Sequence, residues 1–171
     1  MLFNVIIDKI KMMKNPIGYW RKKGVKIGKN CSIFPTVAFG SEPYLVSIGD
    51  NVRLTNKVQF FTHDGGVWVL RNMYQELSDI DMFGRITVGN NVHIGPDTVI
   101  LPGCNIGNNC IIGVGSIVTK DIPDNSIAAG VPARVIRTIE EYKDKNETRF
   151  EHTKKMGKEE KKAYLVDKYC K

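Results

Sequence analysis

Aliphatic residues recur at an unbroken spacing of six through the centre of this chain. The run comprises Val88, Ile94, Ile100, Ile106, Ile112 and Val118. A smaller residue stands four places after each of the first five, at Val92, Thr98, Cys104, Cys110 and Ser116. A period of six fits neither the 3.6-residue helix nor the alternation of a long strand. The repeat therefore predicts short strands separated by corners.

Three such strands would make one triangular coil of about 18 residues, as expected for a stacked repeat architecture. Each aliphatic residue would then lie beneath its counterpart three hexads later, with Val88 under Ile106 and Ile94 under Ile112. Earlier residues keep the same frame, including Ile27, Ile33, Ile48, Leu54 and Phe60. A Gly-x-Asn turn follows several frame positions, beginning at Gly28, Gly49, Gly89 and Gly107. Gly and Asn tolerate positive φ, so these tripeptides predict recurring tight corners.

The repeat is interrupted after Phe60. The next frame aliphatic, Val88, lies 28 residues further on, which is no multiple of six. We therefore expect an inserted loop over about residues 64–85. Loops carried on a rigid scaffold often supply binding residues.

Charge is concentrated at the two ends of the chain. The formal net charge is +7, but residues 1–24 hold six Lys/Arg against Asp8 alone, and residues 25–137 are neutral overall. A neutral repeat region without a nucleic-acid-binding motif predicts no nucleic-acid partner. No apolar run is long enough to span a bilayer, and no cleavable leader is recognisable at the N-terminus, so we expect a cytoplasmic protein.

The cysteines fit the repeat better than they fit a metal site. Cys31, Cys104 and Cys110 occupy the small inward position of their hexads, where cysteine behaves as a compact apolar residue. Cys170 lies in the polar tail. We expect no metal, because metal ligands would have to converge at suitable spacing.

The hexads "IGPDTV", "ILPGCN", "IGNNCI" and "IGVGSI" resemble those of the hexapeptide-repeat proteins. The resemblance covers roughly residues 25–137 and implies an all-β fold, a left-handed parallel β-helix, with short N- and C-terminal helices. Residues 1–24 are expected to form a basic amphipathic helix that packs against the first coil; peripheral membrane contact is the alternative. Residues 138–171 are expected to form a charged helical tail.

The stretch "GVGSIVTKDIPDNSIAAGVPARVIR", residues 113–137, resembles the terminal coil of hexapeptide acyltransferases that use acetyl-CoA. These include maltose and galactoside O-acetyltransferases, virginiamycin-type acetyltransferases and the sugar O-acetyltransferases of capsule and lipopolysaccharide assembly. The resemblance implies that acetyl-CoA is contacted by Val114, Thr119, Lys120, Pro132, Arg134 and Arg137. Cationic side chains on a rigid edge suit the phosphates of coenzyme A.

His63 is the candidate catalytic residue. It follows Phe60 by three places, which turns it outward at a corner just before the inserted loop. In the resembling acyltransferases a histidine at such a place is the general base, and active sites lie between neighbouring subunits of a homotrimer. Imidazole is suited to proton transfer near neutral pH. A carboxylate of the loop could orient it, and the candidates are Asp64, Glu76, Asp79 and Asp81.

His93 also points outward and could line the acceptor site. The resemblance implies O-acetylation of a sugar or nucleotide-sugar acceptor in surface-polysaccharide biosynthesis, by direct attack on the thioester. An N-acetyltransferase acting on an amino sugar and a non-catalytic hexapeptide scaffold are the alternatives. A hexapeptide-repeat carbonic anhydrase needs three converging histidines, whereas His63 and His93 are the two in the repeats.

Overall fold

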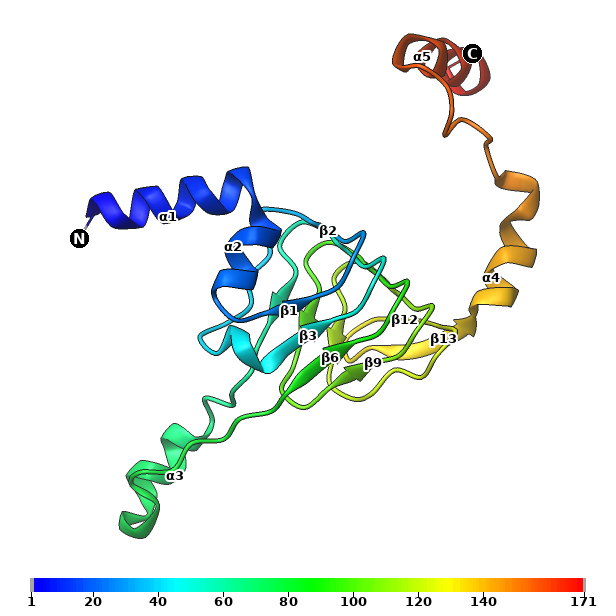
Figure 1. The fold of residues 1–171 in the computed structure, drawn as a ribbon. Helices are drawn as coiled ribbons and strands as arrows, with labels where there is room; N and C mark the ends of the chain where they lie inside the picture. Colours follow the sequence, from blue (N-terminus) through cyan, green and yellow to red (C-terminus); the bar gives the residue numbers. More distant parts are fainter. Residues whose placement is uncertain (1, 171) are drawn as a thin grey trace. The chain divides into compact units, whose positions relative to one another are not determined.

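The computed structural model describes the backbone of residues 2–170 and the side chains of residues 7, 8 and 10–170 (Figure 1). It divides into two compact units, one ending at Glu140 and the other beginning at Glu141. The first unit holds the repeats, and the second is helical.

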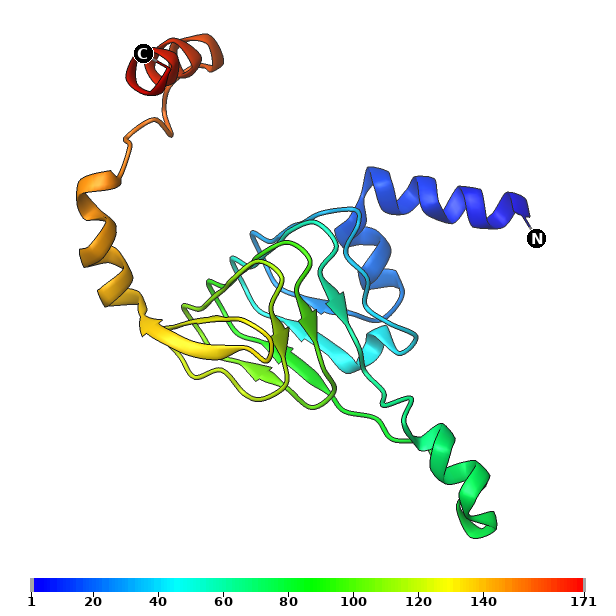
Figure 2. The ribbon, with the colours of Figure 1, turned by 180° about the vertical axis from the view of Figure 1, so that it is seen from behind.

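The repeats form three parallel sheets that consecutive strands visit in turn. The first sheet contains β1 (Lys26–Ile27), β3 (Val46–Ile48), β6 (Ile86–Val88) and β9 (Asn105–Ile106). The second contains β2 (Ser32–Ile33), β4 (Arg53–Leu54), β7 (His93–Ile94), β10 (Ile111–Ile112), β12 (Ser126–Ala129) and β13 (Arg134–Thr138), of which β13 alone is antiparallel to its neighbour. The third contains β5 (Gln59–Phe60), β8 (Val99–Ile100) and β11 (Ile117–Val118). Figure 2 shows these coils stacked on one another.

Residues 18 apart stack as the repeat predicts. Val88 pairs with Ile106, Ile94 with Ile112, and Ile100 with Val118. The inward side chains of Ile94, Ile100 and Ile112 are fully buried. Burying a branched aliphatic side chain contributes about 1.5–3 kcal/mol, so the stacked aliphatic columns stabilise the fold. Cys104 and Cys110 are also buried, which raises the pKa of both thiols.

The glycines of the Gly-x-Asn corners do not adopt positive φ, although glycine tolerates it. Among the Gly-x-Asn turns it is the asparagines that adopt positive φ, as at Asn91 (55°) and Asn109 (53°). The glycines are needed for close approach, because a Cβ on Gly89 would lie 2.8 Å from the carbonyl carbon of Gly107 in the next coil. The asparagines also form a ladder, since Asn91 Nδ2 donates to Asn109 Oδ1 at 2.9 Å.

The N-terminal segment forms two helices where one was expected. Helix α1 (Leu2–Lys14) ends before Asn15, and α2 (Pro16–Lys22) begins with proline, whose fixed φ suits the first turn of a helix. The Asn15 side chain accepts the Gly18 N–H at 2.9 Å. Trp20 of α2 lies edge-on to the buried Phe39 ring, with centroids 5.0 Å apart. Helix α2 therefore covers the first coil.

An arm of residues 61–85 leaves the coils between β5 and β6. It contains α3 (Val67–Met73) and the short 3-10 helix η2 (Gln75–Leu77), and in Figure 1 it projects away from the coils. Arg71 ties its two halves together, because its Nε donates to the Ile80 carbonyl at 2.6 Å and its guanidinium pairs with Asp81. The arm matches the insertion expected over residues 64–85.

The C-terminal unit contains helices separated by a non-helical segment. Helix α4 (Ile139–Asn146) begins two residues before the start of this unit, at Glu141. It is followed by the 3-10 helix η3 (Glu147–Arg149) and by α5 (Lys158–Tyr169). Lys168 donates to the Glu151 carboxylate at 2.7 Å, and Tyr164 and Tyr169 donate to it as well. These hydrogen bonds lower the pKa of Glu151 to about 2. No helix within residues 2–170 combines the length and hydropathy needed to cross a membrane.

Candidate active site

The base of the arm fixes the position of His63. The backbones of His63 and Phe83 form an antiparallel bridge. On either side of it, Asp64 N donates to Met82 O at 2.9 Å and Gly84 N donates to Thr62 O at 2.8 Å. The arm thus leaves and re-enters the coils as two paired segments, and His63 stands where they meet the coils.

Glu42 holds the imidazole of His63. The carboxylate oxygen Oε2 lies 3.0 Å from His63 Nδ1, and the buried Thr62 hydroxyl donates to the same oxygen at 2.7 Å. Glu42 directly precedes the 3-10 helix η1 (Pro43–Leu45). The hydrogen bonds from Thr62 and His63 lower the pKa of Glu42. Its side chain is 17% exposed, against 40% for His63.

This arrangement assigns the protons of the imidazole. A carboxylate can only accept hydrogen bonds, so Nδ1 carries the hydrogen that points to Glu42. In the neutral ring Nε2 then has the free lone pair. The geometry thus favours Nε2 as a proton acceptor, and it places a negative charge beside the imidazolium that would result.

A cleft of about 300 Å³ opens beside His63. Phe61, Asp64 and Gly65 line it on the side of the arm, and Leu101 and Pro102 line it from the next coil. The cleft combines apolar walls with an imidazole and a carboxylate, and such a combination is typical of small-molecule sites.

None of the arm carboxylates that were expected to orient His63 is its hydrogen-bond partner in the structure. Asp64 accepts the Gly66 N–H at 2.7 Å and so turns into its own loop. Asp81 pairs with Arg71. Asp79 and Glu76 are exposed on the arm. Asp64 and Asp81 thus bond to residues of the arm, and the carboxylate that contacts His63 is that of Glu42, in the preceding coil.

Glu42 had a signal in the sequence. Phe39 lies six residues after Ile33 and so continues the hexad frame, and its ring stacks on Phe60 at 4.8 Å. Glu42 follows Phe39 by three residues, and His63 follows Phe60 by three. Extending the frame to Phe39 therefore aligns Glu42 with His63 one coil later.

His93 lies elsewhere. It stands on the outer face of the second sheet, in register with Arg53 and Ile111, whereas His63 follows a strand of the third sheet. Burial, and then the nearby charge of Arg53, lower the pKa of His93. Within one chain the structure does not bring the two histidines together.

The edge of the coils that carries His63 also carries Thr119 and Lys120. Phe61 N donates to Ile100 O at 2.9 Å, and Leu101 N donates to Val118 O at 3.0 Å, so this corner stacks through three successive coils. Neighbouring strands lie roughly 4.8 Å apart. The backbones of Phe61 and Thr119 therefore lie about two strand spacings, roughly 10 Å, apart along this edge, and the side chains of Thr119 and Lys120 are exposed there.

The other predicted donor residues lie in the last coil, beside β13 or in β13 itself, which belongs to the second sheet. Ala133, next to the exposed Pro132, donates its N–H to Ile117 O at 2.8 Å, and Val114 is 70% exposed at the corner before β11. In β13 a bulge shifts the register, so that Arg134 opposes Ala129 and Arg137 opposes Ile127. Because Ile127 and Ala129 are two residues apart, both arginines project from one face.

No group of three or more His, Cys, Asp or Glu side chains suited to a metal ion occurs in the part of the chain that the structure describes.

Comparison with known proteins identifies the repeats. The family model described as "Bacterial transferase hexapeptide (six repeats)" matches residues 85–120. "Protein CapG" of Staphylococcus aureus is 48% identical over 94% of this chain and 94% of its own length. The galactoside O-acetyltransferase of Escherichia coli K12 is 49% identical over 57% of this chain, which matches 46% of that enzyme.

Solved structures agree with these relatives. A galactoside acetyltransferase in complex with coenzyme A is 31% identical, with a TM-score of 0.60 over 83% of this chain and 82% of that one. A maltose O-acetyltransferase from Clostridium difficile 630 is 32% identical, with a TM-score of 0.56 over 71% of this chain and 73% of that one.

Proposed function

This chain belongs to the hexapeptide-repeat family of acyltransferases, and we propose that it transfers an acetyl group from acetyl-CoA to a hydroxyl of a sugar or sugar-containing acceptor. The names of the galactoside and maltose relatives support both halves of this reaction. Because the chain covers about half of the E. coli enzyme, the acceptor is proposed as a class, a sugar hydroxyl. We place the reaction in surface-polysaccharide biosynthesis, as the resemblance of the terminal coil implies.

The observation that carries the proposal is the hydrogen-bonded set of Glu42, Thr62 and His63 beside the cleft. Nε2 of His63 would accept the proton of the acceptor hydroxyl while the acceptor oxygen bonds to the thioester carbonyl carbon. The carbon–sulfur bond then breaks, and the imidazolium returns the proton to the departing thiolate. General-base assistance of this kind contributes roughly 10²- to 10⁴-fold in rate.

Glu42 acts in this scheme through His63. Its carboxylate keeps Nδ1 protonated, holds the ring plane and stabilises the imidazolium formed during transfer. We therefore propose Glu42 as a positioning residue. No exposed nucleophile is needed, because the acceptor attacks the thioester directly.

The donor would bind along the edge that leads from the terminal coil to His63. Lys120 and the two arginines of β13 supply positive charge for the phosphates of coenzyme A, and Pro132 offers an apolar surface for adenine. The thioester end would then reach the cleft two coils away.

We further propose a left-handed winding of the coils and a homotrimer with active sites between subunits, as in the resembling enzymes. One observation supports the trimer: the arm exposes large apolar side chains, such as Trp68 (68%) and Met73 (64%). Such exposed apolar residues mark protein contacts.

A thiol-release assay tests the proposal. The purified chain is supplied with acetyl-CoA and a panel of sugars, nucleotide sugars and amino sugars, beside His63→Ala and the matched control His152→Ala in the C-terminal unit. We expect turnover with a hydroxyl acceptor, a loss of at least roughly 10²-fold in His63→Ala and no loss in the control. Turnover of His63→Ala within about threefold of the parent would refute the base, and transfer only to an amino group would refute O-acetylation.

A further inference from the structure

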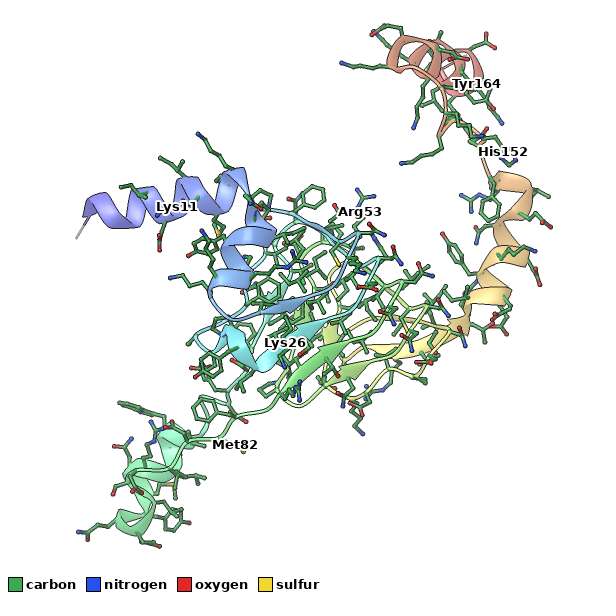
Figure 3. The ribbon with its side chains drawn as sticks, viewed as in Figure 1. Lys11, Lys26, Arg53, Met82, His152 and Tyr164 are labelled. Atoms are coloured by element: carbon green, nitrogen blue, oxygen red, sulfur yellow. The ribbon has the colours of Figure 1, made fainter. Side chains whose placement is uncertain are left out.

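Helices α1 and α2 enclose a groove. The groove holds about 480 Å³. Ile7, Ile10 and Tyr19 contribute apolar surface to it, and three lysines surround this surface, Lys11, Lys14 and Lys22. In Figure 3 the labelled Lys11 lies on α1, remote from the arm that carries Met82.

Apolar side chains of α1 remain uncovered. Ile10 is 49% exposed and Met13 is 55% exposed. The expected cover of the first coil is supplied by α2, through Trp20, while α1 packs against α2 and is tied to it by the pair Asp8–Lys23 at 3.6 Å. Helix α1 thus presents apolar surface that the coils do not need.

The positive charge of the protein is concentrated on the same segment. Residues 1–24 carry a net charge of +5, whereas residues 25–137 are neutral. Asp8 is the one acidic residue among these 24, and Lys23 already neutralises it. Apolar side chains bordered by unneutralised lysines match the boundary between acyl chains and anionic headgroups.

We propose that the α1–α2 hairpin docks on the surface of an anionic lipid bilayer. Ile10 and Met13 would enter the headgroup region, while Lys11, Lys14 and Lys22 contact lipid phosphates. A twofold contact with a second copy of this chain fits the face less well, because it would place the three lysines against their own copies. The proposal goes beyond acetyl transfer and does not depend on it.

Vesicle sedimentation tests this docking. The full chain is mixed with vesicles of phosphatidylcholine, with or without phosphatidylglycerol, at low and high salt. We expect binding only to the anionic vesicles and weakening with salt. Each lysine near an anionic surface contributes roughly fivefold in affinity, so the triple variant Lys11→Gln, Lys14→Gln, Lys22→Gln should bind on the order of 100-fold more weakly.

A matched variant removes the same charge from the C-terminal unit: Lys154→Gln, Lys155→Gln, Lys158→Gln. It should bind like the parent, and both variants should keep the parent's thermal unfolding midpoint. Ile10→Asp should also weaken binding, since it places a charge in the headgroup region. The proposal is wrong if the parent does not bind anionic vesicles at low salt or if the two triple variants bind equally. It is also wrong if Ile10→Asp dissociates an oligomer while vesicle binding is absent.

Discussion

Replacing Glu42 by glutamine removes one negative charge and little volume. The substitution leaves an oxygen that can accept from His63 Nδ1, but it removes the charge that stabilises the imidazolium. A hydrogen bond to a charged group contributes about 1.5–3 kcal/mol. His63 is 40% exposed, so solvent screens the pair and the lower part of this range applies.

A free energy of about 1.5–2 kcal/mol corresponds to roughly a 10- to 30-fold lower kcat. We expect the loss in kcat, with the KM for acetyl-CoA nearly unchanged, because Glu42 contacts His63 and not the donor edge. Glu42→Asp should recover part of the rate if the shorter carboxylate still reaches Nδ1.

Thiol release measured over a range of acetyl-CoA concentrations separates kcat from KM. Glu76→Gln is the matched control, since Glu76 is exposed on the arm and its removal changes the charge equally. The thermal unfolding midpoint shows whether each variant is folded. A folded Glu42→Gln protein with kcat within about threefold of the parent, or with its whole defect in KM, would refute the positioning role.

Two further predictions concern stability. Gly89→Ala should lower the free energy of unfolding by more than about 1 kcal/mol, because its Cβ meets the next coil, whereas Gly65→Ala, with nothing within 4 Å, should be nearly neutral in a urea titration. Glu151 has a pKa lowered to about 2, so its stabilising contribution is complete above its ordinary value near 4.5 and is lost as pH falls towards 2. The protection of α5 against hydrogen exchange, relative to the intrinsic exchange rate at each pH, should therefore fall over that interval, and in Glu151→Gln it should be low at neutral pH already; equal protection in parent and variant would contradict this.

The hexad period predicted the inward residues of the central coils. The frame predicted Ile94 and Ile112 as stacked inward residues, and their pairing and burial confirm it. Such a prediction succeeds because the period is imposed by repeated local contacts between coils. The same frame predicted the outward position of His63, which lines the cleft.

The hexad frame did not predict the hydrogen-bond partner of His63 or the secondary structure of the N- and C-terminal segments. Glu42 lies in the first interruption of the repeat, between Phe39 and β3, where the chain forms the 3-10 helix η1. The single N-terminal helix was wrong because Pro16 has no N–H to donate and starts a new helix. Contacts between segments far apart in sequence leave little trace in local composition.

The arm departs from the coils without disturbing their stacking. Ile48 pairs with Val88 and Phe60 pairs with Ile100, although 25 intervening residues leave and return between β5 and β6. Doubling the length of a flexible loop costs only about 0.6 kcal/mol in closure entropy. The scaffold can therefore tolerate arms of very different length and composition, so the arm could be exchanged between relatives while the aliphatic columns stay the same.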